Sequence, residues 1–302
     1  MAAIPDGKSL LPPENAIVAI PKKGRLYERC MKLLEGAGLE HRRPPRVDIA
    51  VCESLPVTLV FLPAHDIAAY VGEGNVDVGI TGQDVLSESA PESANNVDIA
   101  MELGFGKCKL CVQAPIADNI KDVKELAGKR IVTSFPALCK QFFDKYDEPG
   151  NPTKIKYISG SVEAACGLGL ADGIVDLVET GTTMRAAGLE VVADIMESQC
   201  VVIVNKHTKH RELADLIVQR IEGYITAEKF LMISYNVAQE NLAACKEVTP
   251  GKRSPTVTQL EEKGWCAVQA LILKKSGSVI MDKLKKIGAT DILLFAMQNT
   301  RM

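Results

Sequence analysis

The 302-residue sequence predicts an α/β fold in which two similar lobes are followed by a smaller α+β domain. Short, wholly apolar runs alternate with helical patterns through most of the chain, which is typical of strands covered by helices. The pattern V-D-x-x-x-T-G occurs twice, at residues 76–82 and 175–181, each time after a helical segment and a glycine. Because ligands bind beyond the carboxyl ends of strands in such sheets, two related lobes predict a cleft between them.

The first strand is expected at residues 16–20, where AIVAI is apolar throughout. A helix follows the loop PKKGR, because Leu26, Cys30, Leu33 and Leu34 recur at helical spacing before two glycines. The same order of elements continues and predicts largely parallel sheets. Further strands are expected at residues 48–51, 58–61, 76–80, 109–113, 130–133, 154–157, 174–178 and 199–204, and helices at 64–72, 136–146, 162–171 and 183–187.

The last part of the chain has a different pattern. An extended run at 228–237 precedes a helical segment, a Pro/Gly turn at 249–256 and two further strand candidates. An amphipathic helix at 278–287 ends at Gly288, and a last strand follows. The order β-α-β-β-α-β predicts a ferredoxin-like domain.

Composition narrows the function classes. The net charge of −3 and the lack of a basic bias give no sign of nucleic-acid binding, and no apolar run is long enough for a membrane span. The first residues lack the pattern of a signal peptide and predict a disordered arm, so a soluble cytoplasmic protein is expected. The nine cysteines are expected to be buried free thiols. Zinc binding by Cys108, Cys111, His207 and His210 is disfavoured, because residues three apart on a strand face opposite ways.

The stretch from Asp176 to Gly188, DLVETGTTMRAAG, is the strongest candidate site. Gly181 lets the backbone approach a ligand, and Thr182 or Thr183 is expected to cap a helix that begins near Met184. A helix N-terminus with nearby hydroxyls binds anions, whereas carboxylates suit ligand hydroxyls or Mg²⁺. A sugar phosphate satisfies both demands, and an ordinary capped turn is the alternative.

Cations and polar loops elsewhere support an anionic ligand. Lys22, Lys23 and Arg25 surround Gly24 after the first strand, and Lys107 and Lys109 flank a later one, although single lysines are usually solvated. Further candidate loops lie at residues 81–84, at 133–136 and at 159–163, where Ser161 is expected to cap a helix with Glu163 in its first turn. The four histidines, His65 included, form no convincing catalytic arrangement, and the P-loop and Rossmann glycine patterns are absent.

Several of these pieces, taken in order, resemble the ATP phosphoribosyltransferases, the enzymes of the first step of histidine biosynthesis. The resemblance covers about residues 15–302, and the block at 159–189 is its most specific part. The matching segments are PKKGRL (21–26), VDVGITGQD (76–84), GFGKCKL (104–110), RIVTSFP (130–136), SGSVEAACGLGLADGIVDLVETGTTMRAAGL (159–189), TPGKRSPTV and GWCAVQALI.

The resemblance implies a fold and a domain arrangement. It implies two periplasmic-binding-protein-like lobes of type II with an interlobe cleft, and a C-terminal ACT-like regulatory domain. The expected divisions are an arm at 1–14, lobe I at 15–106 and 190–222, lobe II at 107–189 and the regulatory domain at 223–302.

The resemblance also implies a reaction, in which N1 of ATP is joined to C1 of the ribose of phosphoribosyl pyrophosphate and pyrophosphate leaves, with Mg²⁺ present. Its implied partners are these substrates, histidine as an inhibitor, and copies of the chain that form dimers and then a hexamer. In the implied site, Asp176 takes the ribose hydroxyls and Glu163 is a candidate base. The sugar-phosphate loop is Glu179, Thr180, Gly181, Thr182, Thr183 and Met184, and the nucleotide and polyphosphate set is Lys23, Gly24, Arg25, Gly82, Asp84, Lys109 and Ser134.

One departure and two alternatives stay open. Many relatives carry an arginine near residues 63–65, where this chain has Pro63, Ala64 and His65. A non-catalytic solute-binding or effector-sensing protein would share the two lobes but would not explain carboxylates in a phosphate loop. A Rossmann-like ribosyltransferase would place paired acids directly before its loop, whereas Asp176 and Glu179 are three residues apart.

Overall fold

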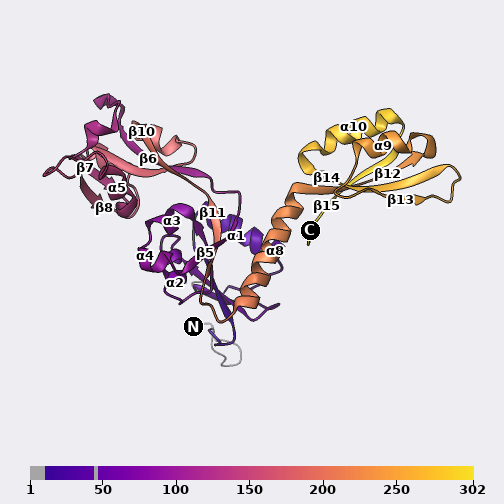
Figure 1. Cartoon of the computed structure of the whole chain (residues 1–302), viewed down its shortest axis with the longest axis horizontal. Helices are drawn as coiled ribbons and strands as arrows, with labels where there is room; N and C mark the ends of the chain where they lie inside the picture. Colours follow the sequence, from indigo (N-terminus) through magenta and orange to yellow (C-terminus); the bar gives the residue numbers. More distant parts are fainter. Residues whose placement is uncertain (1–10, 44–46) are drawn as a thin grey trace. The chain divides into compact units, whose positions relative to one another are not determined.

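The computed structural model describes residues 11–43 and 47–302 (Figure 1). Most of the arm expected at residues 1–14 therefore lies outside the described part. The described chain forms two compact units, one of residues 11–30 and 41–214 and the other of residues 31–40 and 215–302. No helix in the described ranges is both long enough and apolar enough to cross a bilayer.

The first unit contains two lobes, each built on its own sheet. In lobe I the strand order is β2-β3-β1-β4-β11-β5, and β1 pairs in parallel with both β3 and β4. Helices α2 to α4 lie beside this sheet (Figure 1). The elements are β1 (Ala16–Pro21), α1 (Arg25–Gly36), β2 (Ile49–Val51), β3 (Val57–Leu62), α2 (Ile67–Gly72), β4 (Val78–Gly82), α3 (Gln83–Glu88), α4 (Pro91–Ala94), β5 (Val97–Glu102) and β11 (Cys200–Asn205).

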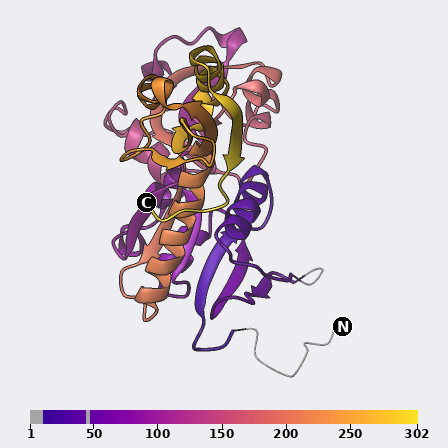
Figure 2. The same ribbon diagram turned by 90° about the vertical axis from the view of Figure 1, so that its right-hand side faces the viewer.

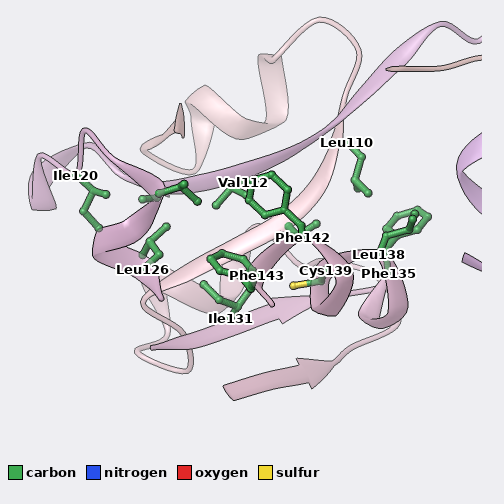
Figure 3. Close-up of a cluster of buried hydrophobic side chains, with 13 residues drawn as sticks. Leu110, Val112, Ile120, Leu126, Ile131, Phe135, Leu138, Cys139, Phe142 and Phe143 are labelled. Carbon is green, nitrogen blue, oxygen red and sulfur yellow. The ribbon is translucent and has the colours of Figure 1, made fainter. Parts of the chain in front are cut away.

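Lobe II has the strand order β10-β6-β9-β7-β8. Its core is apolar: Phe143 and Cys139 of α5 pack against Ile131 of β7 (Figure 3), as the buried run RIVT and an amphipathic helix require. The elements are β6 (Cys108–Pro115), β7 (Arg130–Thr133), α5 (Pro136–Phe143), β8 (Lys154–Tyr157), α6 (Ala164–Gly167), β9 (Gly173–Val178), α7 (Thr182–Ala186) and β10 (Leu189–Ser198), with short 3₁₀ turns at Ile116–Asp118 and Val123–Leu126.

The sheets are mixed, so the prediction of largely parallel sheets is wrong. Strand β11 runs antiparallel to β4 and β5, and β6 runs antiparallel to β9 and β10. The reason is that the chain crosses between the lobes twice, and the strands that carry it across run in opposite directions. Strand β10 also belongs to the second sheet, so lobe II extends to residue 198 and the expected boundary after residue 189 is wrong.

The two crossings form a hinge of residues 103–107 and 199. Leu103 N donates to Cys200 O at 2.9 Å, and Cys200 N donates to Phe105 O at 3.0 Å, so the segments are bonded to each other. Gly104 and Gly106 have φ values of 74° and 66°, a conformation that favours glycine. The motif GFGKCKL is therefore the crossing itself, with the bend provided by its two glycines.

The second unit contains the ferredoxin-like domain, with strand order β13-β14-β12-β15 and antiparallel pairing. Helices α9 and α10 cover the face formed by Ile233, Tyr235 and Val268. The predicted order of elements and the end of α10 at Gly288 are confirmed. The elements are α8 (Arg211–Lys229), β12 (Phe230–Ala238), a 3₁₀ turn (Gln239–Asn241), α9 (Leu242–Val248), β13 (Thr256–Gln259), β14 (Trp265–Leu273), a 3₁₀ turn (Lys274–Ser276), α10 (Gly277–Ile287) and β15 (Thr290–Ala296).

Helix α8 was not expected, and the division between the units falls within it. The second unit takes in residues 31–40 and continues from Asp215, so the expected boundary at residue 223 falls inside the helix. The end of α1 lies beside α8 (Figure 1 and Figure 2), and an added Cβ at Gly36 would lie 2.0 Å from Tyr224. Asn299 Nδ2 donates to Gly36 O at 2.8 Å, which connects the end of the chain to α1.

Candidate active site

A cavity of about 650 Å³ lies between the two lobes of the first unit. This volume is within the range of pockets that bind small molecules. Lobe I contributes the loop after β1 and the start of α3, the hinge contributes Phe105 and Gly106, and lobe II contributes the loop after β9. The predicted interlobe cleft is therefore present, and loops at the carboxyl ends of strands from both lobes line it.

The loop from Glu179 to Met184 lines this cavity. Gly181 has φ of 71°, and a Cβ at this position would lie 2.7 Å from Arg185 Nη1. Arg185 Nη2 donates to Thr180 O at 2.9 Å, which fixes the turn from inside. The backbone conformation favours glycine at residue 181, and any larger residue would also displace the arginine side chain that holds the loop.

The helix after this loop begins earlier than expected. Helix α7 starts at Thr182 with Gly181 at the N-cap, and no side chain caps it, so the prediction of a cap by Thr182 or Thr183 is wrong. The hydroxyls of Thr180 and Thr182 lie 3.0 Å apart instead. Because the first N–H groups of a helix lack partners within it, these amides and hydroxyls together can donate to a phosphate.

Asp176 and Glu163 interact through their charges but are not among the residues that line the cavity. Burial, and secondly the charge of Glu163, raise the pKa of Asp176 to about 6. Its Oδ1 accepts from Leu177 N at 2.8 Å. Glu163 is at the N-cap of α6 and Ser161 lies outside the helix with φ of 51°, so the expected cap by Ser161 is wrong.

Asp176 and Glu163 offer carboxylate oxygens, the kind of ligand that Mg²⁺ prefers. Among the described residues there is no group of three or more acidic, histidine or cysteine side chains that could hold a metal by themselves. Mg²⁺, however, prefers hard oxygen ligands and is commonly bound by one or two carboxylates together with substrate phosphates. A cation near Asp176 would also offset the repulsion from Glu163 that contributes to its raised pKa.

The lobe I side of the cavity includes Lys23, Gly24, Gly82 and Asp84. Gly24 has φ of 85°, which allows the tight turn before α1. Arg25 is the first residue of α1, but its side chain lies outside what the structure describes. The cation that is described on this loop and lines the cavity is Lys23.

Asp84 is buried at the start of α3 and is bonded to the end of β10. Ser198 Oγ donates to Asp84 Oδ1, and Asp84 N donates to Ser198 Oγ at 3.1 Å. Burial raises the pKa of Asp84, and the bond from Ser198 opposes this effect. The pair joins lobe I to the residue that precedes the return crossing.

Like Asp176 and Glu163, two residues of the predicted nucleotide and polyphosphate set, Lys109 and Ser134, do not line the cavity. Lys109 Nζ lies 2.6 Å from Asp194 Oδ2 and 3.8 Å from Glu197 Oε1 on the strands of lobe II. Ser134 lies in the turn before α5. The neighbouring Thr133 organises this turn, because the Thr133 hydroxyl donates to Val175 O at 2.7 Å. Neither residue is part of the cavity lining.

The cavity-lining residues that sequence reasoning missed include Arg29, His65 and Phe105. The guanidinium of Arg29 lies 5.4 Å from the centre of the Phe105 ring. Its position four residues after Arg25 was a usable signal, since both fall on one side of a helix. His65, expected to be an ordinary surface residue, lines the cavity, and its Nε2 is 3.1 Å from Asp66 Oδ1.

The nine cysteines are free thiols, and seven are buried as predicted, whereas Cys108 and Cys166 are half-buried. Cys108 lines the cavity, whereas the Cys111 thiol contacts Asp194 Oδ1 at 3.4 Å on strand β10. The described residues therefore form no zinc site from this pair.

Comparisons with known proteins give one family over nearly the whole chain. The family model for ATP phosphoribosyltransferase matches residues 63–223, and the model for its C-terminal domain matches residues 227–299. The ATP phosphoribosyltransferases of Yarrowia lipolytica and Schizosaccharomyces pombe are 47% and 44% identical, over 96% and 95% of this chain and 97% of each relative. A solved ATP phosphoribosyl transferase (HisG:HisZ) complex from Thermotoga maritima is 27% identical with a TM-score of 0.58, over 68% of this chain and 96% of that one.

Proposed function

The chain belongs to the ATP phosphoribosyltransferase family, and we propose that it joins N1 of ATP to C1 of the ribose of phosphoribosyl pyrophosphate, with release of pyrophosphate. The observation that carries this proposal is the cavity in which the loop Glu179–Met184 of lobe II shares one space with Lys23 and Gly24 of lobe I. Two loops suited to phosphate on facing lobes match a reaction between two phosphorylated substrates.

The loop after β9 is the proposed site of phosphoribosyl pyrophosphate. The hydroxyls of Thr180, Thr182 and Thr183 and the amides of the first turn of α7 bind the 5-phosphate. Asp176, just before this loop, accepts hydrogen bonds from the ribose hydroxyls. The contact between the Thr180 and Thr182 hydroxyls supports this assignment, because a phosphate oxygen can replace one hydroxyl as the partner of the other.

ATP is proposed to bind on the lobe I side. Lys23 and Arg29 provide positive charge for its polyphosphate, and Gly82 leaves room near the buried Asp84. Phe105 provides an aromatic surface for the adenine ring. Lys109 is not part of the proposed ATP site, because it pairs with Asp194 and Glu197 and does not line the cavity.

Positioning and charge stabilisation account for most of the proposed catalysis. As pyrophosphate leaves, the ribosyl carbon becomes cationic, so the enzyme must hold both substrates in line and stabilise separated charge. Mg²⁺, when bound near Asp176 and Glu163 with the substrate, would supply charge to the departing pyrophosphate. Glu163 is also the candidate base for the adenine, and its proximity to Asp176 supports a role in the same site.

The second unit is proposed to mediate inhibition by histidine, in a cytoplasmic enzyme whose dimers assemble into a hexamer. Its ferredoxin-like topology and its match to the C-terminal domain of the family support a separate regulatory role.

Pyrophosphate release tests the proposal. The purified chain should release pyrophosphate only when ATP, phosphoribosyl pyrophosphate and Mg²⁺ are all present. A binding protein with the same two lobes would instead bind a ligand without turnover, and the absence of release would reject the catalytic proposal.

A further inference from the structure

Glu88, the last residue of α3 in lobe I, caps a helix of lobe II. Its Oε1 accepts a hydrogen bond from Ala137 N at 2.7 Å, and its Oε2 accepts one from Leu138 N at 2.9 Å. Both amides belong to the first turn of α5, which spans Pro136–Phe143. The carboxylate thus satisfies two donors that have no partner within their own helix.

We propose that Glu88 is an interlobe clamp: a positioning residue that sets the separation of the two lobes across the cavity. The inference rests on the proposed transfer reaction only for its effect on turnover. The lobes are also joined by the hinge at residues 103–107 and 199, where Gly104 and Gly106 provide the bend, and by the Ser198–Asp84 hydrogen bonds beside that hinge. A hinge lets lobes open and close, so a contact on elements away from the hinge favours one closure angle.

The clamp is well placed to act on the cavity. Asp84, which lines the cavity, lies one turn before Glu88 on α3. A shift of Glu88 would therefore move Asp84 with it, because both belong to the same short helix. On the other side, α5 follows Phe135, which also lines the cavity. Phe135 N donates to Thr133 Oγ1 at 2.9 Å, and that hydroxyl bonds to β9, the strand that leads into the threonine loop.

A carboxylate is the suitable group for this task. A negative charge at a helix N-terminus is stabilised by the helix dipole, and hydrogen bonds to an ionised group are stronger than neutral ones. Glutamine would retain one acceptor oxygen but would direct its NH₂ at the second amide. Alanine would leave both amides without an acceptor. The substitutions therefore form a graded series at one position.

Hydrogen exchange and steady-state kinetics of the full-length protein test the clamp. Glu88→Gln and Glu88→Ala are compared with Glu92→Gln, an exposed acid on the neighbouring helix of lobe I. Exchange of the Ala137 and Leu138 amides should accelerate about three- to tenfold in Glu88→Gln and more in Glu88→Ala. Exchange in α10 should not change, and the control should match the wild type.

The kinetic result separates positioning from plain structural support. Turnover should fall at least about threefold in the same graded order, while the dissociation constant for phosphoribosyl pyrophosphate, whose loop lies within lobe II, should stay within about twofold. Unchanged exchange in both variants overturns the clamp. Faster exchange with wild-type turnover overturns its positioning role. If no form of the protein turns over, faster exchange still supports the clamp, and only the proposed reaction fails.

Discussion

The carboxyl group of Asp176 lies close enough to Glu163 for the neighbouring charge to add to the burial that raises the pKa of Asp176 to about 6. An ionised Asp176 is therefore less favourable in the folded protein than in the unfolded chain. In the proposed reaction this cost is offset when ribose hydroxyls or a cation bind. The site is thus suited to its ligand at the expense of the stability of the empty enzyme.

Replacing Asp176 with asparagine should make the protein more stable and inactive. The stability associated with the raised pKa is present below about pH 4 and is lost as the pH rises through about 6. Above pH 7 the variant should gain about 1–3 kcal/mol in the free energy of unfolding, with the gain disappearing near pH 4. Urea unfolding at several pH values measures this difference.

Asp172→Asn is the control, and it should change the free energy of unfolding in the opposite direction to Asp176→Asn. The hydrogen bond from Arg130 lowers the pKa of Asp172 to about 2, so its contribution to stability is present above about pH 4 and is lost as the pH falls towards 2. This variant should be less stable than the wild type at neutral pH. A loss of stability in Asp176→Asn at pH 8 would contradict the conclusion that ionised Asp176 destabilises the folded protein.

Gly181→Ala should weaken the binding of phosphoribosyl pyrophosphate without unfolding the protein. The added methyl group would meet Arg185 Nη1 at 2.7 Å, and the backbone at φ of 71° disfavours alanine. We expect a loss of stability of about 1 kcal/mol and a rise in the dissociation constant of at least tenfold, measured by calorimetry. Gly188→Ala, at φ of 72° in open space after the same helix, controls for backbone strain alone. Equal effects of the two substitutions on binding would argue against the loop.

Ser198→Ala should destabilise the first unit through Asp84. The substitution removes the hydroxyl that donates to the buried Asp84 carboxylate, and we expect a cost of about 1–3 kcal/mol in chemical unfolding. The pKa of Asp84 should rise further, because the lost bond opposes its burial. Ser89→Ala removes a hydroxyl that donates to a backbone carbonyl of α3, and it should cost less. Equal costs would show that the Ser198–Asp84 hydrogen bond stabilises the protein no more than an ordinary bond to a backbone carbonyl.

Deleting residues 230–302 should abolish inhibition by histidine while turnover remains measurable. The cut keeps α8 whole, because this helix extends to Lys229. It removes the bond from Asn299 to Gly36, so a lower melting temperature is expected. Pyrophosphate release is measured with and without histidine. Inhibition that persists in the truncated protein would show that the ferredoxin-like domain is not required for regulation.

The sequence was most informative where a segment is buried on both faces. Strand β7, buried from Ile131 to Thr133, begins and ends at the predicted residues 130–133. Strand β8 also matches its predicted range of 154–157, although most of its side chains are exposed. The order of the C-terminal elements was also predictable, because polar turns separate segments of clear periodicity. The threonine loop was identified because three hydroxyls and a glycine follow a buried strand directly.

The sequence was least informative where a strand is exposed or irregular. Strand β5 exposes most of its side chains, including Ile99, so no apolar run marks it. Strand β10 has two irregularities in its register with β6, which interrupt the alternation expected of a strand. The contact of Glu88 with α5 joins residues about fifty apart, and no local pattern encodes it.

The most direct test of the central claim is the identification of the product. The chain is incubated with ATP, phosphoribosyl pyrophosphate and Mg²⁺, and the nucleotide product is isolated for NMR and mass spectrometry. We predict one phosphoribosyl group attached through its C1 to N1 of the adenine, with one pyrophosphate released for each product formed. Hydrolysis of phosphoribosyl pyrophosphate without a joined product, or attachment at another atom of ATP, would contradict the proposed reaction.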